Sequence, residues 1–234
     1  MKRIAIVYVL IALLLLCVSC SQDKIPASTY NAMYEHLSQV WAQSLAHADA
    51  KIAFFGDSRV IGADWNTAYP DSEVINLGVG GDKIGNLLIR MPQIRTLKEN
   101  GQLQCCFLAI GGNDCMSGSY DSTAFRTEYD RLLSELEGLG ITVYVNTVAG
   151  ITDEGSDVSA KTARTVNSRM DEANRIIKEL AASHSMTVID MAALMNTSGG
   201  KLKGEYATPD GVHFSEVGNQ LWFDTLRPYV QIYD

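Results

Sequence analysis

Five short apolar runs, separated by stretches with helical periodicity, limit the possible folds of this chain more than any other feature of its sequence. Each run is predominantly apolar and has no regular alternation, whereas a strand with one face in water alternates apolar and polar residues. Continuous runs are typical of parallel strands that helices cover on both faces. The runs span residues 52–55, 74–77, 105–110, 141–145 and 186–189.

Helices are expected between these runs, over residues 84–99, 122–137 and 160–182, and one more before the first run, over residues 30–48. Strands that alternate with helices predict the α/β class. We therefore expect a three-layer α/β/α sandwich around a mostly parallel five-stranded sheet. The 234 residues offer no second set of strands, so the fold has room for one domain.

Four glycine-marked motifs occur along the chain, and the first three each follow one of the first three predicted strands. In a parallel sheet, the ligand crevice lies outside the carboxyl ends of the strands. The topology alone is thus expected to bring Ser58, Gly81 and Asn113 together. The motifs are Phe-Phe-Gly-Asp-Ser at 54–58, Asn-Leu-Gly-Val-Gly-Gly-Asp at 76–82, Gly-Gly-Asn-Asp at 111–114 and Asp-Gly-Val-His at 210–213.

The first and last motifs supply a candidate nucleophile and its base. A serine hydroxyl is a weak nucleophile until a base lies within hydrogen-bond reach, and His213 is the histidine with a carboxylate, Asp210, three positions before it. Asp210 could hold the imidazole tautomer that leaves Nε2 free for Ser58. Taken singly, a serine after a strand is also a common helix N-cap, and Asp-x-x-His is also a common turn.

The second and third motifs supply candidate donors for an oxyanion hole. A tetrahedral intermediate needs donors fixed where its oxyanion forms, and three are available: the backbone amides of Ser58 and Gly81 and the side-chain amide of Asn113. Each has a structural alternative. Gly81 could mark a tight turn with positive φ, and Asn113 could be a turn residue after a strand.

With these four motifs in this order, the sequence resembles the SGNH hydrolases, also called the GDSL esterase/lipase family, from about Lys51 to the C-terminus. Ser58, Gly81, Asn113 and His213 match the four residues that name the family, and Asp210 matches its third triad member. The resemblance implies a flavodoxin-like α/β fold and a serine esterase that works through an acyl-enzyme. The chemistry of such a triad requires no metal and no organic cofactor.

Three further residues are singled out with alternatives left open. Arg59 places a cation in the first turn of the expected helix, where it opposes the helix dipole; it could face a polar or anionic substrate group and so bind substrate, or it could be solvated. Trp65 and Trp222 could stack on a sugar ring or pack in the core.

The N-terminus has the features of an export signal. Lys2 and Arg3 precede a continuous apolar run over residues 4–16, which is too short to span a bilayer, and Cys20 ends a lipobox-like sequence. We expect a lipoprotein signal peptide over 1–19, lipidation of Cys20, a polar tether over 20–29 and the hydrolase domain over 30–234. An ordinary secretory signal cleaved near the same position is the alternative.

Export makes the mature chain more acidic, because loss of Lys2 and Arg3 changes the formal net charge from −8 to −10. This charge argues against nucleic acid as a partner. A lipid anchor would attach the domain to a membrane of the cell envelope, facing the periplasm or the cell surface. Cys105 and Cys106 are adjacent on one apolar strand and point to opposite faces, so buried thiols are expected rather than a disulfide framework.

The sequence thus predicts an exported esterase that removes short acyl groups, such as acetyl, from carbohydrate. The motifs encode the reaction and not the acyl or alcohol group, so a lysophospholipase or thioesterase acting on lipid-derived esters remains an alternative. A surface lipoprotein that binds glycans without turnover is an alternative of another class. Neither the oligomeric state nor the alcohol part of the substrate can be read from the residues.

Overall fold

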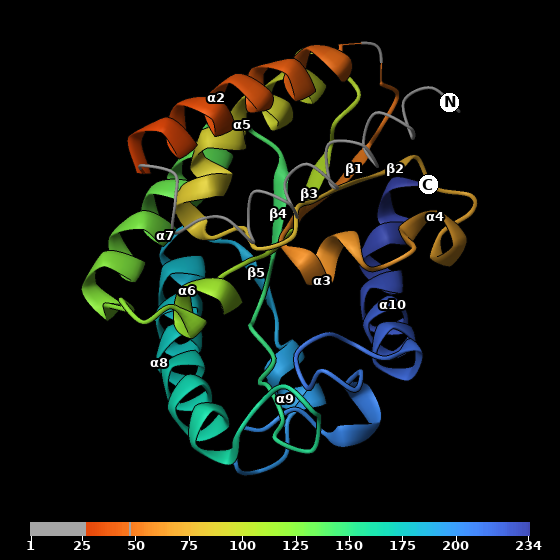
Figure 1. Cartoon of the computed structure of the whole chain (residues 1–234). Helices are drawn as coiled ribbons and strands as arrows, with labels where there is room; N and C mark the ends of the chain where they lie inside the picture. Colours follow the sequence, from red (N-terminus) through yellow and green to blue (C-terminus); the bar gives the residue numbers. More distant parts are fainter. Residues whose placement is uncertain (1–26, 47) are drawn as a thin grey trace.

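A five-stranded, fully parallel sheet forms the centre of the computed structural model, which describes residues 27–46 and 48–234 (Figure 1). The strand order is β2-β1-β3-β4-β5. The first strand, β1, is an inner strand. The chain then forms the edge strand β2, returns to the other side of β1 with β3, and adds β4 and β5 toward the opposite edge. The strands are β1 (Ile52–Gly56), β2 (Val74–Gly78), β3 (Cys105–Ala109), β4 (Thr142–Asn146) and β5 (Thr187–Ile189).

Helices cover both faces of the sheet and complete a three-layer α/β/α sandwich (Figure 1). One face is covered by α5 (Ile84–Glu99), α7 (Ser122–Glu137) and α8 (Ala160–Ser183), and α2 (Ala27–Ser44) packs on α5. The other face is covered by α3 (Ser58–Ile61), α4 (Trp65–Ala68), α9 (Met191–Met195) and α10 (Glu216–Val230). The remaining elements are α6 (Gly112–Met116), η2 (Gly204–Tyr206) and η3 (Gln231–Tyr233).

Alternate residues of each strand enter opposite halves of the core. Cys106 and Phe55 pack with the helices of the α5 side, whereas Cys105 and Phe54 pack with those of the α10 side. Both thiols are buried and unpaired, as expected from their adjacent positions. Because both faces of the strands are covered, the strands contain continuous apolar runs instead of alternating ones. The fold class predicted from the sequence is confirmed.

The element boundaries differ from expectation mainly at the first helix. It was expected over residues 30–48, but α2 spans Ala27–Ser44 and so overlaps the end of the expected tether. Leu45 extends the apolar pattern beyond the helix because it is buried in the core although it lies outside the regular turns. Periodicity thus located the helix but placed its end too late, because burial of a residue does not require it to be helical.

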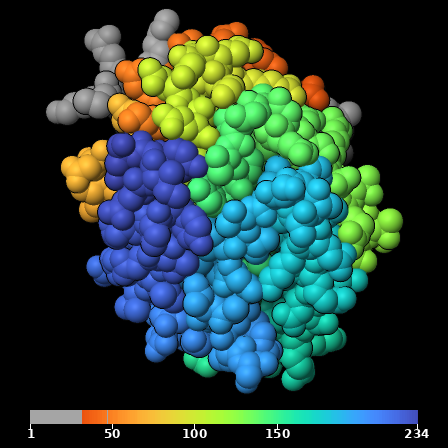
Figure 2. Space-filling view, turned by 180° about the vertical axis from the view of Figure 1, so that it is seen from behind, coloured from red at the N-terminus to blue at the C-terminus, as the bar shows by residue number. Residues whose placement is uncertain are grey.

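Helices that cover opposite faces of the sheet lie on opposite sides of the molecule in Figure 2. Seen from behind, the C-terminal segment (dark blue) and α8 (cyan) occupy opposite sides, with the residues that follow α8 in lighter blue between them (Figure 2). No helix among residues 27–46 and 48–234 is both long and apolar enough to cross a bilayer. The expected signal peptide and Cys20 lie outside the described residues, as does most of the expected tether.

Candidate active site

Ser58 begins α3, directly after β1 and Asp57. Asp57 accepts a hydrogen bond from the Arg59 backbone amide at 3.0 Å and so caps this short helix. Burial raises the pKa of the Asp57 carboxyl to about 6, although the Arg59 charge and the amide hydrogen bond act in the opposite direction. Through this cap, Asp57 fixes the turn that presents Ser58.

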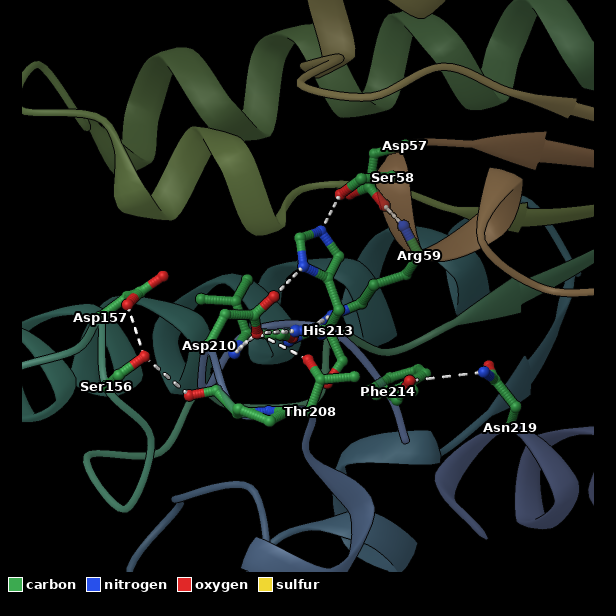
Figure 3. A network of polar contacts seen from close by, with 12 residues as sticks. Asp57, Ser58, Arg59, Ser156, Asp157, Thr208, Asp210, His213, Phe214 and Asn219 are labelled. Carbon is green, nitrogen blue, oxygen red and sulfur yellow. Dashed lines mark hydrogen bonds and ion pairs between the residues drawn. The ribbon is translucent and has the colours of Figure 1, made fainter. Parts of the chain in front are cut away.

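His213 lies in the loop between η2 and α10, and its ring is oriented between Ser58 and Asp210 (Figure 3). Its Nε2 atom is 3.0 Å from the Ser58 Oγ, and its Nδ1 atom is 2.7 Å from the Asp210 Oδ2. Since a carboxylate accepts hydrogen bonds only, the network assigns the Nδ1 proton to the Asp210 contact. Nε2 is then free to accept the proton of the Ser58 hydroxyl.

Asp210 is held in place by several donors besides the imidazole. Its Oδ1 accepts hydrogen bonds from the Thr208 hydroxyl and from the backbone amides of Val212 and His213, at 2.7 to 2.9 Å. Burial acts to raise the pKa of this carboxyl, but the hydrogen bonds outweigh burial and hold the pKa well below its usual value. Asp210 therefore stays ionised beside the imidazole. Thr208 was not singled out by the sequence.

Gly211 makes the tight turn between Asp210 and His213 possible. Its φ is +76°, a conformation that side chains other than glycine rarely adopt. Its carbonyl oxygen accepts a hydrogen bond of 2.8 Å from the Thr152 amide, and the Ser156 amide donates to Pro209 at 2.7 Å. The connection after β4 thus supports the turn that carries the imidazole.

Gly81 lies in the loop after β2, which passes beside Ser58. A Cβ added at Gly80 would lie 4.0 Å from the Ser58 Cβ, and Gly81 itself has the expected positive φ, +82°. Within residues 27–46 and 48–234, the backbone amides of Ser58 and Gly81 have no hydrogen-bond acceptor. Both N–H groups therefore remain available to an oxyanion next to the Ser58 hydroxyl.

Asn113 lies in the first turn of α6, after β3, and is half-buried. Its Nδ2 atom donates a hydrogen bond of 2.9 Å to the backbone carbonyl oxygen of Asp82. An amide nitrogen carries two hydrogens, so the second stays available to another acceptor. The contact fixes the orientation of the amide relative to the Gly81 loop.

A buried ion pair behind this loop is a feature that the sequence did not predict. The Asp82 Oδ2 accepts hydrogen bonds from Nε and Nη2 of Arg90, at 2.8 and 2.7 Å, and the Tyr34 hydroxyl donates to the Asp82 Oδ1. Arg90 also donates to the carbonyl oxygens of Gly56 and Leu77, at the ends of β1 and β2. Its side chain is fully buried. The sequence offered one indication of this ion pair, the presence of Asp82 in the second motif. It gave no indication of the partner, Arg90, which lies on α5.

Arg59, expected to contact substrate or to be solvated, is instead bound to the protein backbone. Its guanidinium donates hydrogen bonds of 2.7 to 3.1 Å to the carbonyl oxygens of Ala149, Gly150 and Val212. A solvated side chain is therefore the wrong expectation. The backbone carbonyls offset the unfavourable position of a cation in the first turn of a helix.

Trp65 and Trp222 both lie in the core, with 1% and 2% of their surface exposed. Trp65 stacks on Phe54 with 3.8 Å between the ring centroids, and Trp222 donates its indole N–H to Asn146. This burial supports the packing interpretation over stacking on a sugar.

A small pocket of about 30 Å³ adjoins the nucleophile turn, but neither Ser58 nor His213 lines it. Its walls include Asp57, Arg59, Gly112 and Phe214. Because the nucleophile and its base do not line this pocket, we do not assign it as the place where the ester group binds. Among the described residues, no three His, Cys, Asp or Glu side chains are arranged to hold a metal ion.

Comparison with known proteins gives one family match and a set of similar folds. Residues 44–221 match the model of the GDSL-like Lipase/Acylhydrolase family. A search of curated proteins finds no match.

Three solved structures illustrate the similarity of the fold. A Streptococcus pneumonia protein provisionally named a platelet activating factor is 19% identical, with a TM-score of 0.72 over 92% of this chain and 98% of its own. An acetyl xylan esterase is 23% identical, with a TM-score of 0.62 over 76% and 98%. A GDSL-like lipase from Bacteroides thetaiotaomicron is 17% identical, with a TM-score of 0.67 over 83% and 97%.

Proposed function

The chain belongs to the GDSL-like lipase/acylhydrolase family and is a carboxylic ester hydrolase, and we propose that Ser58, His213 and Asp210 are its catalytic triad. The observation that carries the proposal is the continuous hydrogen-bond path from the Ser58 hydroxyl through the imidazole to the carboxylate, with distances of 3.0 and 2.7 Å. Acyl transfer through a covalent intermediate requires a nucleophile, a base in contact with it and a group that orients the base, and this path contains all three.

The reaction proceeds in two halves. His213 Nε2 accepts the Ser58 proton as Oγ attacks the acyl carbon, and Asp210 stabilises the imidazolium that forms. The tetrahedral intermediate collapses when its bond to the alcohol oxygen breaks and His213 returns the proton to the departing alkoxide. A water molecule, deprotonated by the same imidazole, then attacks the acyl-enzyme and releases the acid and the free Ser58 hydroxyl.

The oxyanion is bound by three donors in this proposal. The amides of Ser58 and Gly81 have no acceptor within the described residues, and Asn113 has one N–H that is not used by Asp82. Donors that are fixed before the reaction need no reorganisation as negative charge develops on the carbonyl oxygen. This property favours stabilisation of the transition state over that of the ground state.

For the substrate, we favour a short acyl group such as acetyl on a carbohydrate. One of the similar solved structures is an acetyl xylan esterase, and the formal charge of the chain, −8, disfavours anionic partners. The connections after β1, β2 and β3, which carry Ser58, Gly81 and Asn113, are short, so they offer no long segment to enclose an extended acyl chain.

A lysophospholipase or thioesterase is the second candidate, and it is favoured by the similarity to a GDSL-like lipase. The third, a glycan-binding lipoprotein without turnover, has less support. Binding alone would not need a hydroxyl, an imidazole and a carboxylate in hydrogen-bond contact.

The dependence of kcat/KM on the length of the acyl group tests the substrate proposal. The domain from Ala27 onward would be assayed with p-nitrophenyl acetate, butyrate, octanoate and palmitate, and with acetylated xylan, with Ser58→Ala as the control for non-enzymatic release. We expect kcat/KM to be highest for acetate and acetate to be released from xylan. A maximum at octanoate or palmitate would favour lipid-derived esters, and no turnover of any ester would favour the binding role.

We also propose that the protein is exported and anchored to the cell envelope through Cys20. The proposal is supported by the basic residues, the apolar run over 4–16 and the lipobox-like sequence before Cys20. A lipid anchor would keep the hydrolase domain near substrates that cannot enter the cell.

A further inference from the structure

Arg59 follows the nucleophile in sequence, and its guanidinium joins two other segments of the chain. Nη1 donates to the Ala149 carbonyl oxygen at 2.7 Å, and Nη2 donates to the Gly150 carbonyl oxygen at 2.8 Å. Nε and Nη2 both donate to the Val212 carbonyl oxygen, at 3.1 and 2.8 Å. A guanidinium has five N–H donors, so most of them are taken by these carbonyl groups.

The contacts of Arg59 include both sequence neighbours of His213. Val212 accepts two of the hydrogen bonds, and the guanidinium lies over the Phe214 ring, 4.6 Å from its centroid. Figure 3 shows the Arg59 side chain extending from the nucleophile turn toward the chain around His213. The Arg59 side chain thus connects the nucleophile turn with the residues before and after His213.

The other end of this connection is also fixed. The Arg59 backbone amide donates to Asp57, so the residue is held from its main chain to its guanidinium. Ala149 and Gly150 lie in the connection after β4, which supports the Asp210–His213 turn through the Thr152 amide. Arg59 therefore links the nucleophile turn, the turn of the base and the segment that supports it.

We infer that Arg59 is a positioning residue that holds His213 Nε2 within hydrogen-bond reach of the Ser58 Oγ. The inference rests on the proposed roles of Ser58 and His213. Val212 and His213 are part of a loop, and among the described residues the other hydrogen bond between this loop and the nucleophile turn is the one between the two reacting side chains. Charge-assisted bonds to carbonyls are stronger than bonds between neutral groups and have a defined geometry.

Positioning predicts a specific kinetic defect. A shift of about 1 Å between reacting groups can reduce the rate by roughly 10²-fold, because the reacting atoms then leave the near-attack geometry. Arg59→Met keeps much of the apolar volume but removes every donor. Arg59→Lys keeps the charge but cannot contact three carbonyl groups at once, because an ammonium is a point charge and not a planar fork. We expect both variants to lower kcat by roughly 10- to 100-fold, with KM for p-nitrophenyl acetate changed less than about threefold.

Arg227→Met is a matched control. Arg227 also donates to a backbone carbonyl, that of Ala68, and its guanidinium lies over the Tyr69 ring at 5.5 Å, but its contacts are with α4 and α10 rather than with the site. We expect it to retain wild-type kcat. All assays would be run well below the melting temperature of each variant, which separates loss of stability from loss of rate.

Two further measurements distinguish positioning from substrate binding. The rate at which a neutral phosphonate inactivates the enzyme reports the reactivity of Ser58 and should fall in the Arg59 variants together with kcat. Added guanidinium ion should restore part of kcat in Arg59→Ala, but none in Ser58→Ala or in Arg227→Ala. If Arg59→Met does not fold, Arg59→Lys and the guanidinium rescue of Arg59→Ala still decide the question.

The results that overturn the inference are distinct from those that overturn the proposed function. If Arg59→Lys and Arg59→Met keep wild-type kcat while Ser58→Ala is inactive, the triad stands and the positioning role is wrong. A selective rise in KM for anionic esters would identify Arg59 as a substrate-binding residue instead. If Ser58→Ala retains turnover, the proposed triad itself is wrong, whatever the Arg59 variants do.

Discussion

Asn113 donates a hydrogen bond from its side-chain Nδ2 to the backbone carbonyl oxygen of Asp82, 2.9 Å away, and this contact joins two parts of the proposed oxyanion hole. Asp82 directly follows Gly81, so the amide of one donor is oriented by the loop that carries another. Since Asp82 is itself fixed by the buried Arg90, the orientation is transmitted from a rigid part of the core.

Replacing Asn113 by Ala should therefore remove one oxyanion donor. We expect kcat to fall by roughly 10²- to 10³-fold with little change in KM, because the interaction forms in the transition state. Asn113→Asp should be at least as damaging, since a carboxylate would repel both the oxyanion and the Asp82 carbonyl oxygen. Steady-state kinetics on p-nitrophenyl acetate measure both. If both variants kept full kcat and lost only stability, Asn113 would be a turn residue.

Ser58→Ala should abolish acyl-enzyme formation. We expect kcat to fall by roughly four to six orders of magnitude, as when a triad nucleophile is removed. A serine-directed phosphonate should label the wild-type protein once, at Ser58, and peptide mass spectrometry would identify the position. Labelling at another residue, or near-normal turnover in Ser58→Ala, would be incompatible with the proposed mechanism.

Arg90→Met should be strongly destabilising. It leaves the buried Asp82 carboxylate without its cationic partner, and removing one member of a buried ion pair typically costs about 3–5 kcal/mol. Arg95→Met is the matched control on the same helix, because the Arg95 side chain is 48% exposed and its pair with Glu135 is expected to contribute under about 1 kcal/mol. Urea unfolding measures both. Equal losses of unfolding free energy in the two variants would show that burial of the Asp82–Arg90 pair does not increase its contribution to stability.

His184, at the end of α8, should make stability depend on pH. Hydrogen bonds to Asp130 and Glu137 of α7 raise the pKa of its imidazole, although burial acts in the opposite direction. A raised pKa in the folded state gives stability that is fully present below the unfolded pKa, about 6.5, and is lost as pH rises through the folded value.

The loss of unfolding free energy in His184→Ala should thus be larger near pH 5.5 than near pH 9, in each case relative to wild type. Thermal or urea unfolding across this range provides the measurement. The double variant Asp130→Asn with Glu137→Gln should show the same pH dependence of the loss. A difference independent of pH would mean that His184 contributes packing alone.

The N-terminal proposal has its own test in bacterial cells. Metabolic labelling with a fatty-acid probe should mark the wild-type protein, and Cys20→Ser should remove the label, because the acyl chains would be attached through that residue. Cys105→Ser is the control for incidental acylation, since Cys105 is buried in β3. Secretion of unlabelled wild-type protein would instead favour an ordinary signal peptide.

The sequence predicted the fold because its periodicity is a local property. Apolar runs separated by helical segments were sufficient to predict the parallel sheet. No observed strand boundary differs from the expected one by more than one residue. The first helix shows the limit of this reasoning. The apolar spacing continues to Leu45, which is buried, although the helix itself ends at Ser44, so periodicity placed the end of the helix too late.

The contacts that support the site were not predictable in the same way. Arg59 and Val212 are 153 positions apart, and the Tyr34 contact with Asp82 spans 48. No local pattern encodes these pairs. The position of Arg59 in the first turn of a helix was unusual, but the two expectations were a substrate group or solvent. Its partners are backbone carbonyls, which any sequence can supply.

The separation of Ser58 and His213 by 155 positions has a consequence for how activity arises during synthesis. A nascent chain that ends before Thr208 already contains all five strands and the helices from α2 to α9, yet it lacks both the imidazole and its carboxylate. The nucleophile therefore leaves the ribosome long before its base, and no product of translation or C-terminal proteolysis that ends before His213 can carry the complete triad. In a refolding experiment, the first appearance of ester turnover would therefore report when the segment from Thr208 to the C-terminus packs against the rest of the domain.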